Sequence, residues 1–167
     1  MKKLASRTAQ YPLVAEFAFN WNDWAVDTVD GTKKTFGSTP ALSVDPLESA
    51  LNGPVANTVV FDAIPLPPGA VVVGGELINE TAFVGPTAVT LSVGIAGATA
   101  SLVSAADLKA AAGTRTALLL TSALQSNAAG NNVRLTFAYT VANATAGRAR
   151  VRLMYTVDNR SNEAQIV

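Results

Sequence analysis

Apolar and polar positions alternate along much of the chain, and this alternation predicts β-strands. It is cleanest in residues 88–95, where one side of the run is apolar and the other carries Thr90 and Ser92. Successive side chains of a strand point to opposite sides, so a two-residue period indicates a strand with one buried face. The same period recurs in three further runs, residues 11–21, 133–141 and 151–157. We expect the apolar faces of these strands to line a common core.

Two further apolar runs are joined by a Pro-Pro-Gly turn at residues 67–69. The alternation in the second run places Val73 on the inner side. It assigns Glu76 and Glu80 to the outer side. The pair Gly74-Gly75 interrupts this run and indicates either a β-bulge or the close approach of another backbone.

Residues 105–112 depart from the strand pattern, because they are rich in alanine and carry the signals of a short helix. Ser104 and Asp107 form a capping box, in which polar side chains satisfy the first backbone N–H groups of a helix. Gly113 lies where a helix C-terminal glycine belongs. With about seven or eight strands and this one helix, the chain is predicted to be all-β, an antiparallel two-sheet β-sandwich or jelly roll.

The domain organisation is predicted to be simple. A chain of 167 residues suits a single core, and folding at this size buries roughly 70% of the surface of the unfolded chain. Residues 1–10 show no periodicity and are interpreted as a flexible N-terminal arm before a domain of residues 11–167. Residues 37–56 contain three prolines and are interpreted as a long surface connection, a candidate for binding a neighbouring subunit.

Composition narrows the class of function. The chain has no cysteine and no histidine, which excludes thiolate chemistry, histidine bases and the soft metal ligands. Twelve basic and twelve acidic residues give a formal net charge of zero, which favours neither nucleic acid nor an anionic membrane. We find no secretory signal and no apolar stretch of membrane-spanning length. Charged residues are only 14% of the chain, which is typical of a surface packed against copies or a partner; a compact monomer with a Thr/Ser/Asn surface is the alternative.

The acidic residues form no catalytic or metal-binding pattern. Glu76 and Glu80 share a strand face, but four residues of about 3.3 Å each separate them by roughly 13 Å, beyond the carboxylate spacing of glycosidases. Asp23, Asp27 and Asp30 cluster without calcium-loop spacing, so their role is predicted to be structural. We therefore expect no enzyme activity, no catalytic residue, no cofactor and no bound metal.

Trp21 and Trp24 lie near the end of the first predicted strand. They precede an Asp30-Gly31 pair, which predicts a β-hairpin with a two-residue turn. Tryptophans at a strand end are typical of core or interface anchors, and sugar binding is the alternative. An exposed tryptophan at a loop-rich end would favour the alternative.

Residues 148–152 carry three arginines at alternate positions, about 7 Å apart on the outer face of the last strand, and Arg134 is expected beside them on a hairpin partner. The stripe requires acidic neighbours, from an adjoining subunit, a nucleic acid or the chain's own Glu76 and Glu80. Nucleic acid is the weakest of these, because interleaved outer aromatics are lacking. The candidate partner contacts are Lys2, Lys3, Arg7, Trp21, Trp24, Arg148, Arg150 and Arg152.

Three segments follow one another in the middle of the chain: VFDAIPLPPGAVVVGGELINETAF, TLSVGIAG and SLVSAADLKAAAG. Their order is strand, Pro-Gly turn, long strand, second strand and short Ala-rich helix. In this order they resemble the head decoration, or cement, proteins of tailed bacteriophages. The resemblance covers roughly residues 57–125.

The resemblance implies a jelly-roll-like domain on the outside of an icosahedral head. There it would act as a homodimer or homotrimer and clamp neighbouring subunits of the major capsid protein. It also implies synthesis in the host cytoplasm, and no nucleic-acid or membrane partner. The alternative is a tail, neck or fibre-associated virion component, or a host- or carbohydrate-binding module.

Overall fold

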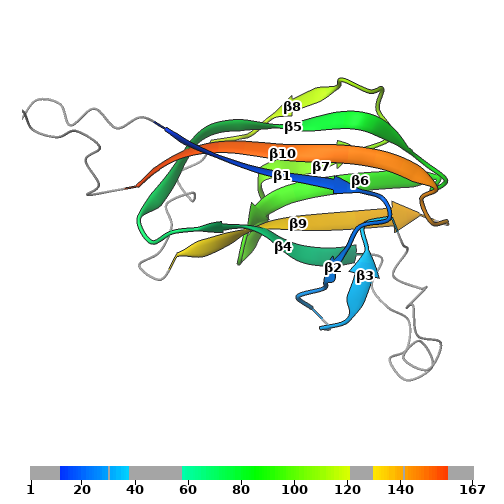
Figure 1. Cartoon of the computed structure of the whole chain (residues 1–167), viewed down its shortest axis with the longest axis horizontal. Helices are drawn as coiled ribbons and strands as arrows, with labels where there is room; N and C mark the ends of the chain where they lie inside the picture. The colour runs from blue at the N-terminus through cyan, green and yellow to red at the C-terminus, as the bar shows by residue number, and fades with distance from the viewer. Residues whose placement is uncertain (1–11, 30, 38–57, 121–129, 141, 158–167) are drawn as a thin grey trace, which may run out of the picture.

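The computed structural model describes residues 12–29, 31–37, 58–120, 130–140 and 142–157. Ten β-strands lie in these residues, and no helix does. Every strand pairing is antiparallel. The prediction of an all-β chain is confirmed, and Figure 1 shows the longer strands stacked as two layers.

Eight of the strands form two four-stranded sheets. The first sheet contains β1 (Leu13–Asn20), β10 (Ala146–Val157), β5 (Ala70–Val84) and β8 (Arg115–Ala117), in that order across the sheet. The second contains β4 (Thr58–Leu66), β9 (Asn131–Thr140), β6 (Ala88–Ile95) and β7 (Ala98–Asp107), again in that order. Since the chain crosses repeatedly between the sheets in this order, the fold is the predicted sandwich in its jelly-roll form.

The remaining two strands form a hairpin, β2 (Trp24–Val26) and β3 (Lys33–Thr35), which extends beyond the β4 edge of the second sheet (Figure 1). Its turn is longer than predicted. The backbone N–H of Asp27 donates to the carbonyl of Thr32 at 2.8 Å, so the pairing closes around residues 28–31 and not around a two-residue turn. Asp30 itself lies outside the described residues.

The core fills the space between the two sheets. The alternate apolar residues of β6, β9 and the middle of β10 are buried as predicted. Phenylalanines from both sheets and from the end of the hairpin meet there: Phe36 lies 4.7 Å from Phe61, 5.0 Å from Phe19 and 5.6 Å from Phe137 between ring centroids. Aromatic pairs at these separations stabilise beyond the area they bury.

The inner face of β5 differs from the predicted alternation at its start. Val72 is 4% exposed and Val73 is 40% exposed, so the expected inward position of Val73 is wrong. The pairing with β10 shifts register at this point, which is the β-bulge that Gly74-Gly75 indicated. Gly75 has a φ of 146°, and a Cβ there would lie 2.3 Å from the carbonyl oxygen of Arg152. Only glycine fits such a backbone. The extra residue of the bulge exchanges the inward and outward positions of the side chains that precede it.

The predicted helix at 105–112 is wrong. Ala106 and Asp107 continue β7 and pair with β6, and the backbone N–H of Leu108 donates to the carbonyl of Val89 at 3.1 Å. The carboxylate of Asp107 accepts a hydrogen bond from the N–H of Lys109 at 2.8 Å and so closes a turn where the capping box was expected. Pairing with a neighbouring strand satisfies the same backbone groups as a helix would, and here tertiary context overrides local propensity.

Several of the connections between consecutive strands cross from one sheet to the other and so do not form hairpins. The turn at residues 67–69 has the predicted form, with the N–H of Ala70 donating to the carbonyl of Pro67 at 3.1 Å and Gly69 at φ 76°. It joins β4 to β5, which lie in opposite sheets. β9 and β10 likewise lie in opposite sheets, so Arg134 is not beside the arginine stripe, as had been expected.

Part of the sequence prediction falls outside the described residues. This applies to the N-terminal arm at residues 1–10 with Lys2, Lys3 and Arg7, and to the connection at 37–56 apart from Gly37. These remain predictions. Within the described part of the chain, no helix is long and apolar enough to cross a membrane.

Candidate functional site

The predicted arginine stripe lies on the outward side of the first sheet, which we call the outer face. Arg148, Arg150 and Arg152 alternate along β10, with β1 on one side and β5 on the other. The register places Arg152 opposite both Glu16 of β1 and Glu76 of β5. The stripe is therefore flanked by carboxylates of its own sheet.

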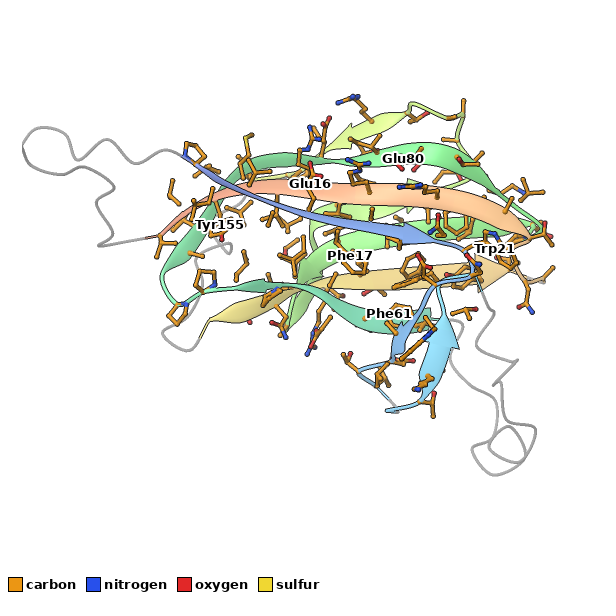
Figure 2. All side chains as sticks on the ribbon, in the orientation of Figure 1. Glu16, Phe17, Trp21, Phe61, Glu80 and Tyr155 are labelled. Carbon is orange, nitrogen blue, oxygen red and sulfur yellow. The ribbon has the colours of Figure 1, made fainter. Side chains whose placement is uncertain are left out.

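Ion pairs join these residues into one network. Arg148 Nε lies 2.5 Å from Glu80 Oε2, and Arg150 Nη2 lies 2.5 Å from Glu80 Oε1. Arg150 also reaches Glu16 at 3.3 Å, and Arg152 donates to the same carboxylate. Figure 2 shows Glu16 and Glu80 on the strands next to β10.

The network continues to the far strand of the sheet. Glu76 lies 3.9 Å from Arg152 Nη1 and 2.7 Å from Arg115 Nη1 of β8. Four arginines and three glutamates thus share one network, in which every arginine has at least one carboxylate partner. Of the three acidic neighbours considered from the sequence, the chain's own glutamates are the ones that the structure places there. Their engagement with arginines also leaves neither Glu76 nor Glu80 as a free carboxylate.

Arg134, on β9 of the second sheet, has a separate partner. Its Nε lies 2.8 Å from Asp62 Oδ1 of β4, and Asn132 donates to the other oxygen of Asp62 at 2.9 Å. This group borders an open hollow at the end of β4 and β9 that also contacts Pro65 and Ala96. Along the hollow, Asp62, Asn132 and Arg134 thus satisfy one another.

Two of the three aspartates near the hairpin, Asp23 and Asp27, have the predicted structural roles, and Asp30 lies outside the described residues. Asp23 accepts hydrogen bonds from the backbone N–H of Asn20 at 2.7 Å and from its side-chain amide at 3.0 Å. Asp27 forms an ion pair with Lys34, described below. Among the described residues, no three acidic side chains are grouped in a way that could hold a metal ion.

The two tryptophans have different environments. Trp21 is half-buried and packs against the core where the chain leaves β1 for the hairpin (Figure 2). The anchor interpretation therefore holds for Trp21. Trp24 is 59% exposed on β2, which is the exposed tryptophan that a binding module requires. The ammonium group of Lys33 lies 4.2 Å from the centroid of the Trp24 ring and makes a cation–π contact with it.

A buried ion pair anchors the hairpin. Lys34 Nζ lies 2.6 Å from Asp27 Oδ2, with side chains only 5% and 1% exposed. The other oxygen of Asp27 accepts hydrogen bonds from the backbone N–H groups of Val29 at 3.0 Å and Val60 at 3.2 Å. Because Val60 belongs to β4, the carboxylate fastens the hairpin to the edge of the second sheet. The part played by Lys34 has no signal in the sequence, since a charged residue is expected at the surface.

Apolar side chains cover the outward side of the same hairpin. Ala25 packs against the core, whereas its neighbours Trp24 and Val26 are 59% and 49% exposed. Val29, near the tip, is 75% exposed. Within the described residues Lys33 makes no ion pair, in contrast to the arginines of the outer face. The hairpin is thus a fixed protrusion with exposed apolar side chains and one cation, Lys33, to which the described residues supply no carboxylate.

One further titratable group lies in the core. Burial raises the pKa of the Tyr139 phenol well above its ordinary value of 10.0. Its hydroxyl has no hydrogen-bond partner in the described part of the chain. The side chain belongs to the buried core and stacks on the Phe137 ring, with 5.7 Å between ring centroids.

Comparison with known proteins gives a likeness of fold. No protein-family model matches the chain, and no curated protein matches it. Among solved structures, the chain is similar to a chain of the cyanophage Pam1 capsid asymmetric unit, with 19% sequence identity and a TM-score of 0.50. The alignment covers 93% of this chain and 93% of that chain. At this identity the likeness shows a shared fold.

Proposed function

We propose that the chain is a structural protein of a bacteriophage virion, and in particular a decoration or cement protein on the outside of the head. The observation that carries the proposal is the shared jelly-roll fold with a chain of the Pam1 capsid asymmetric unit, over 93% of both chains. The resemblance of residues 57–125 to phage decoration proteins points the same way. The proposed partners are the major capsid protein and further copies of the chain, as a homodimer or homotrimer.

A cement protein acts by adding contact area between capsid subunits. Specific protein interfaces bury about 800 Å² on each partner, and the pressure of packaged DNA must break these contacts together with those of the shell. A protein that binds the assembled lattice, and not the free subunits, stabilises the assembled state by mass action. Such a protein needs exposed contact surfaces and no reactive groups. The apolar hairpin meets the first requirement, and the proposal assigns the chain no catalytic role.

Imaging of purified virions by cryo-electron microscopy tests this function. The expected result is density for the jelly roll on the head exterior, at the boundaries between capsid subunits. Density for the chain only in the tail or neck would contradict the cement role and leave the broader virion role. Its absence from virions would contradict both.

A second candidate function rests on the exposure of Trp24. An indole ring on a protruding hairpin is also suited to stacking against a sugar, as in a host-binding module of a tail fibre. Titration of host surface polysaccharide against the wild-type chain and a Trp24→Ala variant distinguishes this function. Saturable binding that the variant loses would favour it over the cement role.

A further inference from the structure

The geometry points to the β2–β3 hairpin, and not the arginine stripe, as the surface that docks on the neighbouring capsid protein. This inference rests on the proposed cement function and names the contact that such a function requires. The partner surface is a protein surface with an apolar recess bordered by a carboxylate.

Exposed apolar area is the first reason. Trp24, Val26 and Val29 are each about half or more exposed and lie within six residues on one protrusion (Figure 1). Tryptophan is the residue type most enriched where truncation costs the most binding energy, and such residues fill pockets of the partner. The outer face has its own exposed apolar residues, Val14 and Met154, but no aromatic side chain among those most exposed.

Rigidity is the second reason. The hairpin is held at its far side by the buried Asp27–Lys34 pair and by the hydrogen bond from the N–H of Thr28 to the carbonyl of Val60 at 2.8 Å. At its near side, Phe36 is 2% exposed in the aromatic core. A contact surface already fixed in shape loses little conformational entropy on binding, so more of its interaction energy appears as affinity.

Charge is the third reason, and it identifies the chemistry of the partner. Each arginine of the outer face already has a carboxylate of its own sheet, so the stripe offers a partner little unsatisfied charge. Lys33 has no carboxylate within the described residues, and it lies over the Trp24 ring. An acidic residue of the partner, beside the recess that receives Trp24, would form an ion pair with Lys33. Such complementary charge favours the correct register of binding.

A binding assay on particles tests the inference. Phage particles produced without the chain are incubated with purified wild-type, Trp24→Ser, Lys33→Glu and Val14→Ser chains, and binding is measured by co-sedimentation over a concentration series. Val14 is the matched control, because it is also 59% exposed but lies on β1. Thermal unfolding of each variant shows that it folds as the wild type does.

The expected result is a loss of affinity of about 30-fold or more for Trp24→Ser, which corresponds to a binding hot spot. Lys33→Glu is expected to weaken binding about tenfold, with a smaller effect at high salt. Val14→Ser should bind within about twofold of the wild type, as expected for a residue outside the contact.

Three results would overturn the inference. Unchanged binding of Trp24→Ser and Lys33→Glu would remove the hairpin from the contact, as would an equal loss for Val14→Ser. Normal particle binding by Trp24→Ser, together with lost binding to host polysaccharide, would assign the hairpin to sugar recognition. Failure of the wild-type chain to bind particles would instead refute the cement function on which the inference rests.

Discussion

In the β2–β3 hairpin one carboxylate and one ammonium group are buried together, whereas on the outer face four arginines and three glutamates share their charges in contact with solvent. The side chains of Asp27 and Lys34 are at most 5% exposed, and those of the outer network are 23% to 61% exposed. The same kind of interaction therefore operates in two different dielectric environments. A buried pair has lost most of its hydration, while an exposed network keeps much of it.

This difference shows why the number of ion pairs does not measure their importance. Loss of one outer-face partner leaves the remaining charges in contact with water, and Arg150 and Arg152 each have a second carboxylate. Loss of Asp27 leaves Lys34 with a buried charge and no carboxylate at 2.6 Å, and frees the backbone donors of Val29 and Val60. We therefore expect stability to depend strongly on the single buried pair and weakly on any one arginine.

The largest effect is expected for Asp27→Ala. This variant should lower the free energy of unfolding by about 3–5 kcal/mol, because it removes the carboxylate that lies 2.6 Å from a buried ammonium group. Chemical denaturation monitored by tryptophan fluorescence measures the change. A loss below about 1 kcal/mol would show that the hairpin charge is better hydrated than its burial indicates.

Lys34→Met provides the matched control for this variant. It removes the ammonium group but keeps most of the aliphatic stem, and Asp27 keeps two backbone N–H donors. We expect a smaller loss of stability than for Asp27→Ala. The reverse order would mean that the ammonium group, and not the carboxylate, organises the hairpin.

A smaller effect is expected for Arg150→Ala on the outer face. Arg150 contacts both Glu80 and Glu16, yet its side chain is 29% exposed, so the free energy of unfolding should fall by about 1 kcal/mol or less. The difference from the wild type should shrink in 1 M salt, where the screening length is about 3 Å. The effect of Asp27→Ala should persist at the same salt concentration, and a similar salt dependence in both variants would contradict the comparison.

The smallest effect at neutral pH is expected for Tyr139→Phe, which removes a buried hydroxyl group from the core. Since the hydroxyl makes no hydrogen bond within the described residues, its loss should leave stability unchanged or raise it by up to about 1 kcal/mol. The outcome shows whether a partner, and not polarity alone, decides the effect of a buried group.

Alkaline pH gives a second measurement on Tyr139. The pKa of the folded phenol is raised above the unfolded value of 10.0, so the unfolded chain loses this proton first. The stability of the wild type should therefore be intact below pH 10 and fall as the pH rises beyond it. Tyr139→Phe should lose less stability over that range, and equal losses in both chains would contradict the raised pKa.

The sequence was sufficient to predict buried strand faces, since alternation reports directly which side of a strand meets the core. β6, β9 and β10 follow this rule. Alternation carries no information on which strands pair, because every strand with one buried face has the same period. This is why Arg134 was expected beside the arginine stripe, although β9 and β10 lie in opposite sheets.

Two local signals did not by themselves determine the local structure. The Gly74-Gly75 pair does mark a bulge, yet which of Val72 and Val73 faces the core depends on the register of β5 with β10. The polar residues at 104–107 resemble a helix start, but the edge of β6 supplies the backbone partners. In both cases a distant strand decides the outcome, and its position is not encoded within the segment.

The candidate site was predictable in part. The stripe and both tryptophans could be identified from residue type and spacing. The division of roles between Trp21, in the core, and Trp24, at the surface, required the position of the hairpin. The burial of Lys34 could not be foreseen either, because it depends on an ion pair with Asp27, whose carboxylate is held by the backbone of β4.

The pairing of β1 with β10 has a consequence for how the chain folds. Glu16 and Arg152 hydrogen-bond across positions 136 residues apart, and β10 lies between β1 and β5. The first sheet therefore cannot assemble until the last strand has left the ribosome. Folds dominated by such distant pairings cross their barrier in milliseconds to seconds, about the slowest range for small domains. Until then the edges of β1 and β5 stay open to other chains, so the rate of synthesis and the concentration of nascent copies should set how much protein aggregates.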